Sequence, residues 1–185
     1  MENGDLKMKT INQSIVNLKS DNIFDVSESL VSLGNNGCTV IIPHVCNNVN
    51  AFGAGFAGAV AKLYPIVKEN YHLLGSKFLK SNLGYTQFVT VKHNDKYNHK
   101  LIFANMISQN GTIGSNNRRP LNYYALCKSM QGVNNFIENN FDAVNKVQIH
   151  APKFGSGLAG GNWAFIQELI KDIWNNYSVF IYHNK

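Results

Sequence analysis

The sequence has few cysteines and no long apolar run. Its three cysteines, Cys38, Cys46 and Cys127, lie far apart and form no C-x-x-C pair, so neither a disulfide framework nor a zinc site is predicted. No apolar stretch approaches the roughly 18 residues of a membrane-spanning helix, and the first seven residues lack the apolar segment of a secretion signal. We therefore expect a soluble protein of a reducing, cytoplasmic compartment.

Acidic residues are also scarce, with eleven Asp and Glu against seventeen Lys and Arg, so the formal net charge is +6. The basic residues are scattered. Their densest group, at Lys92, His93, Lys96, His99 and Lys100, is typical of a solvated surface turn, because basic patches that bind nucleic acid normally combine clustering with interleaved aromatic residues. We expect the charge to aid solubility or to attract an anionic small molecule, and nucleic acid is not an expected partner.

The glycines include two informative groups, in residues 44–57 and 152–163, each of which follows a predicted strand and opens a predicted helix. Glycine lets the backbone approach a ligand, and successive N–H groups at a helix N-terminus bind anions without a basic side chain. Two such loops can clamp one diphosphate. Neither segment carries G-x-x-x-x-G-K-[ST], and neither combines G-x-G-x-x-G with an acidic residue about twenty positions later, so an ordinary ATPase or dehydrogenase is disfavoured. No cofactor or metal is predicted, since no ligand spacing supports a metal site.

Hydrophobic periodicity predicts an α/β protein. With 185 residues, 44% hydrophobic and 15% charged, the chain fits one domain with a sizeable core. Short apolar runs predict strands and repeats at helical spacing predict helices, and their alternation indicates a mostly parallel or mixed sheet. The expected strands are 9–18, 38–43, 87–91, 101–106, 147–151 and 178–182, and the expected helices are 55–63, 67–74 (ending at Gly75), 123–137 and 163–174. The polar loop 109–120 follows a strand, which predicts a position at the ligand-binding rim.

Four blocks of sequence, in this order, resemble a macro domain, the ADP-ribose-binding α/β module. They are 20–24, His44-Val45-Cys46-Asn47 leading into 53–57, 103–109, and 152–163. The likeness spans nearly the whole chain and is greatest to the branch of ADP-ribose-1''-phosphate phosphatases and terminal ADP-ribose glycohydrolases, whose first loop begins with His and whose second carries Gly-Leu-x-Gly-Gly-x-Trp. It implies a three-layer α/β/α fold with a mixed central sheet. We expect a single domain, 1–185, with residues 1–8 as a flexible extension.

The resemblance also implies a site. Asp21 and Asn22 would contact the adenine with Ile23 as an apolar wall, Asn47 would reach the distal ribose, and the two glycine loops would hold the diphosphate. Tyr182 is a further adenine-side candidate. The full set of expected binding residues is Asp21, Asn22, Ile23, Asn47, Asn50, Gly53, Ala54, Gly55, Phe56, Ala57, Gln109, Gly155, Ser156, Gly157, Leu158 and Ala159.

The expected chemistry rests on His44 and Asn47 as catalytic residues. Glycohydrolases of this branch use a lysine nucleophile assisted by an aspartate, but Ser108 or Gln109 stands where the lysine is expected and Ala159 or Asn162 where the acid is expected. The covalent route is therefore not predicted. A phosphatase could instead use His44 near neutral pH, helped by the polar side chains of Asn47, Asn50 and Ser156 and by the oriented diphosphate.

Several alternatives stay open on the sequence. His44 is either such a catalytic group or a core histidine satisfied by a backbone carbonyl, Phe56 is either core or cleft wall, and Arg118 and Arg119 either close over a phosphate or are solvated. The function is either hydrolysis of ADP-ribose-1''-phosphate, with ADP-ribosyl bonds as a weaker candidate, or a non-catalytic ADP-ribose reader or sequestering protein. ADP-ribosylated macromolecules are candidate partners, and a monomer is expected.

Overall fold

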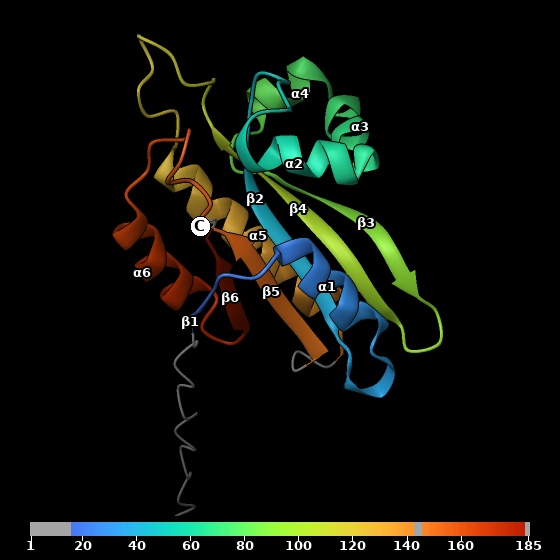
Figure 1. The fold of residues 1–185 in the computed structure, drawn as a ribbon. Coiled ribbons are helices and arrows are strands. Elements are labelled where there is room, and N and C mark those ends of the chain that lie inside the picture. The colour runs from blue at the N-terminus through green and yellow to red at the C-terminus, as the bar shows by residue number, and fades with distance from the viewer. Residues whose placement is uncertain (1–15, 143–145, 184–185) are drawn as a thin grey trace, which may run out of the picture.

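The computed structural model describes residues 16–142 and 146–183, which share one six-stranded sheet (Figure 1). The strand order is β1-β6-β5-β2-β4-β3, and every neighbouring pair is parallel except β3 with β4. The strands are β1 Val16–Lys19, β2 Thr39–Asn47, β3 Thr86–Asn94, β4 His99–Gln109, β5 Val147–Pro152 and β6 Ser178–Tyr182. The sheet is therefore mixed, as the sequence predicted.

Helices cover both faces of the sheet, which gives the expected three-layer α/β/α architecture (Figure 1). On one face lie α5 Tyr123–Asn140 and α6 Trp163–Ile173. On the other lie α1 Ile23–Ser32, α2 Gly55–Leu63, α3 Pro65–Leu73 and α4 Gly75–Ser81, with a 3-10 turn at Gly34–Asn36.

The central strand β2 shows how the sheet divides the core. Successive side chains of a strand point to opposite faces, so Ile41 joins the core beneath α5 and α6 while Val40 and Ile42 join the core beneath α1 to α4. All three are fully buried. A strand that is apolar on both faces belongs in the middle of a covered parallel sheet, and this explains why the run 38–43 was recognisable from sequence.

Two helices were missed. We did not expect α1, although Asn22 caps it by accepting a hydrogen bond from the backbone N–H of Phe24 at 2.9 Å. The helix expected to end at Gly75 is α3, which ends at Leu73. The second missed helix, α4, begins at Gly75, whose φ of +74° turns the chain into a new helical direction. Residues 9–15 of the first expected strand, and the expected extension 1–8, lie outside the described residues. The assignment of 1–185 to one domain stays a prediction.

The carboxyl ends of β2, β4 and β5 meet at one edge of the sheet. The register of β2 against β4 shifts between Cys46 and Asn47, and the Asn48 N–H donates to the Gln109 carbonyl at 3.0 Å. The chain therefore leaves β2 while still joined to the end of β4. In open α/β sheets this edge is where ligands bind.

Candidate functional site

A cavity of about 550 Å³ opens at this edge. Its walls come from the end of β2 and the loop that follows it, from the loop after β5, and from the loop after β4. The lining residues are His44, Val45, Cys46, Asn47, Ala51, Phe52, Gly53, Ala54, Gly55, Phe56, Ala57, Gln109, Thr112, Ile113, Pro152, Lys153, Phe154, Gly155, Gly157, Leu158 and Ala159.

Asn47 holds the first loop in shape. Its side-chain oxygen accepts from the backbone N–H groups of Val49 at 3.0 Å and Ala51 at 3.2 Å, and its amide nitrogen donates to the Ala51 carbonyl at 2.5 Å. The hydroxyl of Tyr71, on α3, donates to the Asn47 backbone carbonyl at 2.7 Å. Asn47 thus satisfies backbone groups that a tight loop would leave without partners.

The first loop then needs glycine for its shape. Gly53 and Gly55 have φ values of +153° and +57°, conformations that residues with a Cβ rarely adopt. Gly55 is also the first residue of α2, so the amide groups that lack partners at this helix end belong to the cavity wall. An anion placed there would meet backbone donors and the positive end of the helix dipole.

The second loop turns back on itself. The Gly161 N–H donates to the Gly155 carbonyl at 2.8 Å and the Gly160 N–H to the Gly157 carbonyl at 2.9 Å. A Cβ on Gly157 would meet no atom within 4 Å, so this residue borders open space, whereas one on Gly55 would lie 3.5 Å from Cδ1 of Leu158. The two loops therefore approach each other across the cavity.

His44 lies beneath the first loop and is only 1% exposed. Its ring meets those of Phe52, Phe56 and Phe103 at centroid distances of 5.7, 5.6 and 6.3 Å. Burial among these rings lowers the pKa of His44 from 6.5 to about 4, and the hydrogen bond to Asn105 offsets only part of that effect. His44 is therefore neutral at pH 7. The expectation that it changes charge near neutral pH was wrong, because desolvation disfavours the imidazolium.

A chain of hydrogen bonds fixes the orientation of that ring. The Asn70 carbonyl accepts from Gln87, the Gln87 carbonyl oxygen accepts from the Asn105 amide nitrogen at 3.0 Å, and Asn105 Oδ1 lies 2.7 Å from His44 Nε2. With this Asn105 orientation, Nε2 carries the proton. Nδ1 is then an acceptor for the Cys46 thiol, whose Sγ lies 3.7 Å away. The partner of His44 is thus a side chain and not the backbone carbonyl that one interpretation assumed.

The other titratable groups of the wall are few. Burial raises the pKa of the Cys46 thiol, so this thiol is not a ready nucleophile. Lys153 is exposed, and its ammonium lies 5.8 Å from the centre of the Trp163 ring. No Asp or Glu lines the cavity along the described ranges 16–142 and 146–183. Within those same ranges no group of three or more His, Cys, Asp or Glu could hold a metal ion. The arrangement offers backbone donors and neutral side chains, which suits binding an anionic ligand.

Comparison with known proteins identifies the fold. No family model matches the chain. An uncharacterised 17.5 kDa protein from the tk-vs intergenic region of Enterobacteria phage T4 is 30% identical over 132 residues, which cover 70% of this chain and 76% of the phage protein. The chain belongs to the same family as that protein. A solved macrodomain protein from Streptomyces coelicolor is 25% identical with a TM-score of 0.63, covering 90% of this chain and 97% of the other. The chain has the macrodomain fold.

A further solved structure is similar in fold. It is Thermosipho africanus DarTG in complex with ADP-ribose, at 13% identity and a TM-score of 0.60, with 90% of this chain and 52% of the other covered. At that identity the likeness concerns the fold alone. The resemblance to macro domains is thus confirmed, whereas the phosphatase and glycohydrolase branch stays a prediction.

Twelve of the residues expected from sequence line the macrodomain cavity. They are His44, Asn47, Gly53, Ala54, Gly55, Phe56, Ala57, Gln109, Gly155, Gly157, Leu158 and Ala159. Phe56 is both a cavity wall and a core residue, the two alternatives left open by the sequence. It lines the cavity, and it also stacks on Phe24 of the core at a centroid distance of 5.4 Å. The roles given to the set stay predictions.

Five expected residues do not line the cavity: Asp21, Asn22, Ile23, Asn50 and Ser156. Asn50 has a φ of +58°. Its side chain contacts His72 Nδ1 at 2.9 Å and Ser76 at 3.5 Å, and neither of these two residues lines the cavity. The Ser156 hydroxyl donates to the Lys153 carbonyl at 3.0 Å.

The other three surround the start of α1. Asn22 caps the helix, Ile23 is buried in the core, and Asp21 is exposed. Asp21 is close enough to Tyr182 for its negative charge, together with the larger effect of burial, to raise the pKa of that phenol to about 12. The Tyr182 carbonyl accepts from the N–H of Lys153 at 3.2 Å, which connects this region to the cavity wall.

Nine lining residues were missed by the sequence prediction. Most are neighbours of predicted ones within the two glycine segments, and Thr112 and Ile113 belong to the loop 109–120 that was expected at the rim. The sequence therefore indicated the segments that form the cavity, although it did not indicate every lining residue in them. The missed residues are Val45, Cys46, Ala51, Phe52, Thr112, Ile113, Pro152, Lys153 and Phe154.

Proposed function

We propose that this macrodomain binds ADP-ribose or a derivative, with the diphosphate held between the two glycine loops. One observation carries the proposal: a cavity of about 550 Å³ lies at the carboxyl ends of β2, β4 and β5, between two loops of glycine-rich backbone. A volume of roughly 300–1,000 Å³ is usual for small-molecule sites. The complex of Thermosipho africanus DarTG with ADP-ribose supports this ligand for a related fold.

The reaction that we propose for the site is hydrolysis of the terminal phosphate of ADP-ribose-1''-phosphate. Water would attack the phosphorus, the bond between the phosphorus and the ribose oxygen would break, and a proton from the water would pass to that oxygen, which gives ADP-ribose and inorganic phosphate. Phosphoryl transfer depends mainly on positioning and on electrostatic stabilisation, and backbone N–H groups supply both. This scheme needs neither a lysine nucleophile nor an acid, and the wall has Gln109 and Ala159 at two positions where those groups were expected.

His44 enters this scheme as a positioning residue. Its neutral ring, held by Asn105, supports the floor of the cavity under Phe52 and Phe56. With a pKa of about 4 it does not exchange a proton near pH 7. His44 should therefore add no pH dependence to any hydrolytic rate between roughly pH 6 and 8, in contrast to an enzyme whose histidine titrates there.

The second candidate is a non-catalytic ADP-ribose reader or sequestering protein. It is favoured by the cavity wall, where burial lowers the pKa of His44 to about 4 and raises the pKa of the Cys46 thiol. ADP-ribosylated macromolecules are the partners we propose for such a reader, acting as a monomer. On location, the structure adds only that no described helix is long and apolar enough to cross a membrane.

Two measurements on the same preparation separate these functions. Calorimetric titration with ADP-ribose should give saturable binding of one ligand per chain, and absence of binding would refute the proposed ligand. Release of inorganic phosphate from ADP-ribose-1''-phosphate should then be followed in the presence of a chelator. Tight binding without phosphate release, and without removal of ADP-ribose from modified protein or nucleic acid, would establish that the protein is a non-catalytic ADP-ribose reader.

A further inference from the structure

A second surface, beside the mouth of the cavity, combines positive charge with aromatic rings. It is formed by the loop after β4, the first turns of α5 and α6, and the start of the loop after β5. We call it the aromatic-basic surface. Its residues are Arg118, Arg119, Tyr123, Tyr124, Lys128, Lys153, Trp163 and Phe165.

Contacts between rings and cations link most of these residues. Arg119 lies over the Tyr123 ring at 5.7 Å, and Lys128 lies over the Tyr124 ring at 5.9 Å. Tyr123 meets Phe165 edge to face at a centroid distance of 4.9 Å, and its hydroxyl accepts from the N–H of Asn162, next to Trp163, at 2.7 Å.

The surface continues from there to the cavity. The Lys153 ammonium lies 5.8 Å from the Trp163 ring centre, and Lys153 itself lines the cavity. Cations and rings therefore alternate from α5, across α6, to the cavity mouth.

The rings of this surface are available to a partner. Tyr124 is 76% exposed and Phe165 is 47% exposed, although aromatic side chains of this size usually contribute to a core. Both lie on helices whose buried sides face the sheet, with Leu126 and Ile166 in the core. Removing either ring should therefore cost the fold little.

Negative charge is absent from the segments that build the surface. Residues 96–137 and 146–167 contain no Asp or Glu, and the next acid on α6, Glu168, is paired with Lys171 at 2.7 Å. Among the described residues, none of the four cations of this surface takes part in an ion pair. Such a surface attracts a polyanion, and its rings can stack with planar bases.

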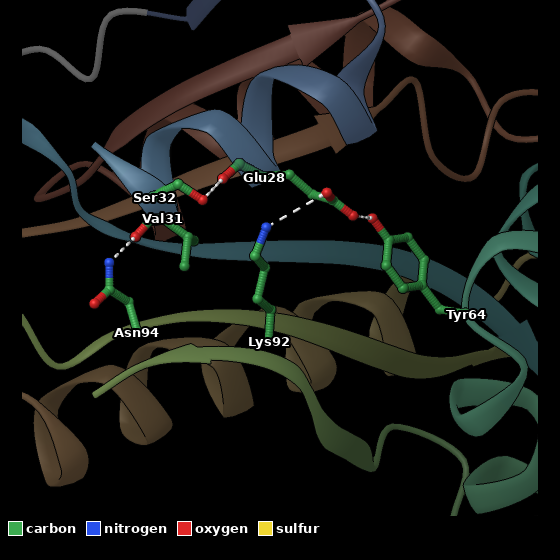
Figure 2. Close-up of polar contacts among 6 residues, drawn as sticks. All are labelled: Glu28, Val31, Ser32, Tyr64, Lys92 and Asn94. Carbon is green, nitrogen blue, oxygen red and sulfur yellow. Dashed lines mark hydrogen bonds and ion pairs between the residues drawn. The ribbon is translucent and has the colours of Figure 1, made fainter. Parts of the chain in front are cut away.

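The basic turn between β3 and β4 provides a contrast. There Lys92 is paired with Glu28 at 3.5 Å, and the same carboxylate accepts from the Tyr64 hydroxyl, as Figure 2 shows. His93 lies 2.9 Å from Asp95. The charge of this group is thus partly used within the fold. The interpretation of the group as a solvated turn holds only in part, because Lys92 and His93 belong to β3, Lys100 belongs to β4, and His99 is buried.

We propose that the aromatic-basic surface binds single-stranded nucleic acid, with Tyr124 and Phe165 stacking on bases and Arg118, Arg119, Lys128 and Lys153 contacting phosphates. The proposal reverses the sequence-based expectation about nucleic acid, because folding brings the cations and rings of residues 118–128 beside those of residues 153–165. It does not depend on ADP-ribose binding in the cavity.

The test is fluorescence anisotropy with a labelled single-stranded 20-mer of mixed sequence, in about 50 mM salt, using the full chain. Binding should weaken steeply as salt is raised, and the same sequence as a duplex should bind more weakly because its bases are not free to stack. The double substitution Tyr124→Ala with Phe165→Ala, which removes no charge, should weaken single-strand binding at least about tenfold.

Matched controls separate stacking from bulk charge. Arg118→Ala with Arg119→Ala removes two charges from the surface and should reduce both affinity and salt dependence. Lys77→Ala with Lys80→Ala removes two exposed charges from α4, on the opposite face of the sheet, and should change affinity less than about twofold. Thermal unfolding and ADP-ribose titration of each variant check the fold and the cavity separately.

Four results would overturn the proposal: no binding by the parent, equal binding of duplex and single strand, equal losses in the arginine and lysine double variants, or full affinity after loss of both rings. Polyglutamate is the competitor that represents an acidic protein partner. If it displaces the oligonucleotide as well as unlabelled single strand does at equal charge, the surface binds polyanions generally and the nucleic-acid assignment is wrong.

Discussion

Asp21 follows β1 and precedes the Asn22 cap of α1, at an exposed position whose charge reaches Tyr182. A carboxylate here can accept from the exocyclic amine of adenine. Asp21→Ala should therefore weaken ADP-ribose binding roughly five- to a hundredfold, the cost of about 1–3 kcal/mol for one lost polar partner. Binding of ribose-5-phosphate, which has no base, should hardly change, and calorimetry measures both.

Asp25 provides the matched control for this substitution. It is an exposed aspartate in the first turn of α1, so Asp25→Ala removes the same charge four residues away. We expect it to leave ADP-ribose affinity within about twofold of the parent, as is usual for an exposed charge that touches no ligand. Equal affinities of the Asp21 variant and the parent, or equal losses in both variants, would remove Asp21 from adenine recognition.

The low pKa of His44 predicts how the free energy of unfolding depends on pH. Burial holds its pKa at about 4 in the folded chain, whereas the unfolded chain has the ordinary value of 6.5. Between these values the unfolded state binds more protons, so the free energy of unfolding falls as pH is lowered from 7 to 4, by on the order of 3 kcal/mol from this one group. His44→Gln cannot titrate and should lack this component.

The measurement is denaturant unfolding of parent and His44→Gln at several pH values from 4 to 8. The readout is the difference in pH dependence, because the substitution itself also changes packing. The two curves should run parallel above about pH 7 and converge as pH falls. Parallel curves over the whole range would mean that His44 is not held neutral by burial.

At the scale of elements, the first glycine loop depends on Asn47. Replacing it with Ala leaves the N–H groups of Val49 and Ala51 without their acceptor, so Asn47→Ala should lower the free energy of unfolding by roughly 1–3 kcal/mol and weaken ADP-ribose binding as the loop loses its shape. Tyr71→Phe removes only the hydroxyl that donates to the same residue, and should cost about 1 kcal/mol.

Thermal unfolding and ADP-ribose titration of both variants test this role. If Asn47 holds the loop in shape, stability and ADP-ribose affinity should fall together. Both losses should be larger in Asn47→Ala than in Tyr71→Phe. If Asn47→Ala kept full stability and affinity but abolished phosphate release, Asn47 would be a catalytic residue, as the sequence suggested, and the scaffold role derived from its hydrogen bonds would be wrong.

The elements differ in how far the sequence predicted them. The strands β2, β4 and β5 were recognisable because both their faces are buried, which leaves continuous apolar runs such as 38–43. The helix α1 was missed because its buried side consists of only Ile23, Phe24, Ser27 and Val31, a pattern that a serine interrupts. Gly75 predicted a stop, but not that the chain would enter α4 at once.

The sequence predicted which segments form the site, but not the side-chain contacts within it. Glycine spacing identified both loops, since positive φ at Gly53, Gly55 and Gly155 requires that residue. The state of His44 was not predictable, because it depends on Phe103 and Asn105, about sixty residues away in sequence. The contacts of the Asn50 side chain with His72 on α3 and Ser76 on α4 were likewise not predictable from the pattern.

At the scale of the whole molecule, the sheet brings together loops that are about a hundred residues apart in sequence. The loop after β2 and the loop after β5 meet because these strands are parallel neighbours, and β4 adds the third wall from the other side. Backbone amides from two helix-forming loops then border one cavity. The anion-binding site that we propose is thus built from backbone amides, which explains why it needs no phosphate-loop lysine.

The most direct test of this account is calorimetric titration of ADP-ribose into Gly157→Glu. Gly157 lines the cavity, and a Cβ there would meet no atom within 4 Å, so the variant should fold while placing a carboxylate where the diphosphate binds. Gly114→Glu is the matched control, because a Cβ there is equally unhindered and Gly114 does not line the cavity. We predict that Gly157→Glu loses ADP-ribose binding by at least about a hundredfold while Gly114→Glu stays close to the parent. Unchanged affinity in a folded Gly157→Glu variant would contradict the placement of ADP-ribose between the two loops.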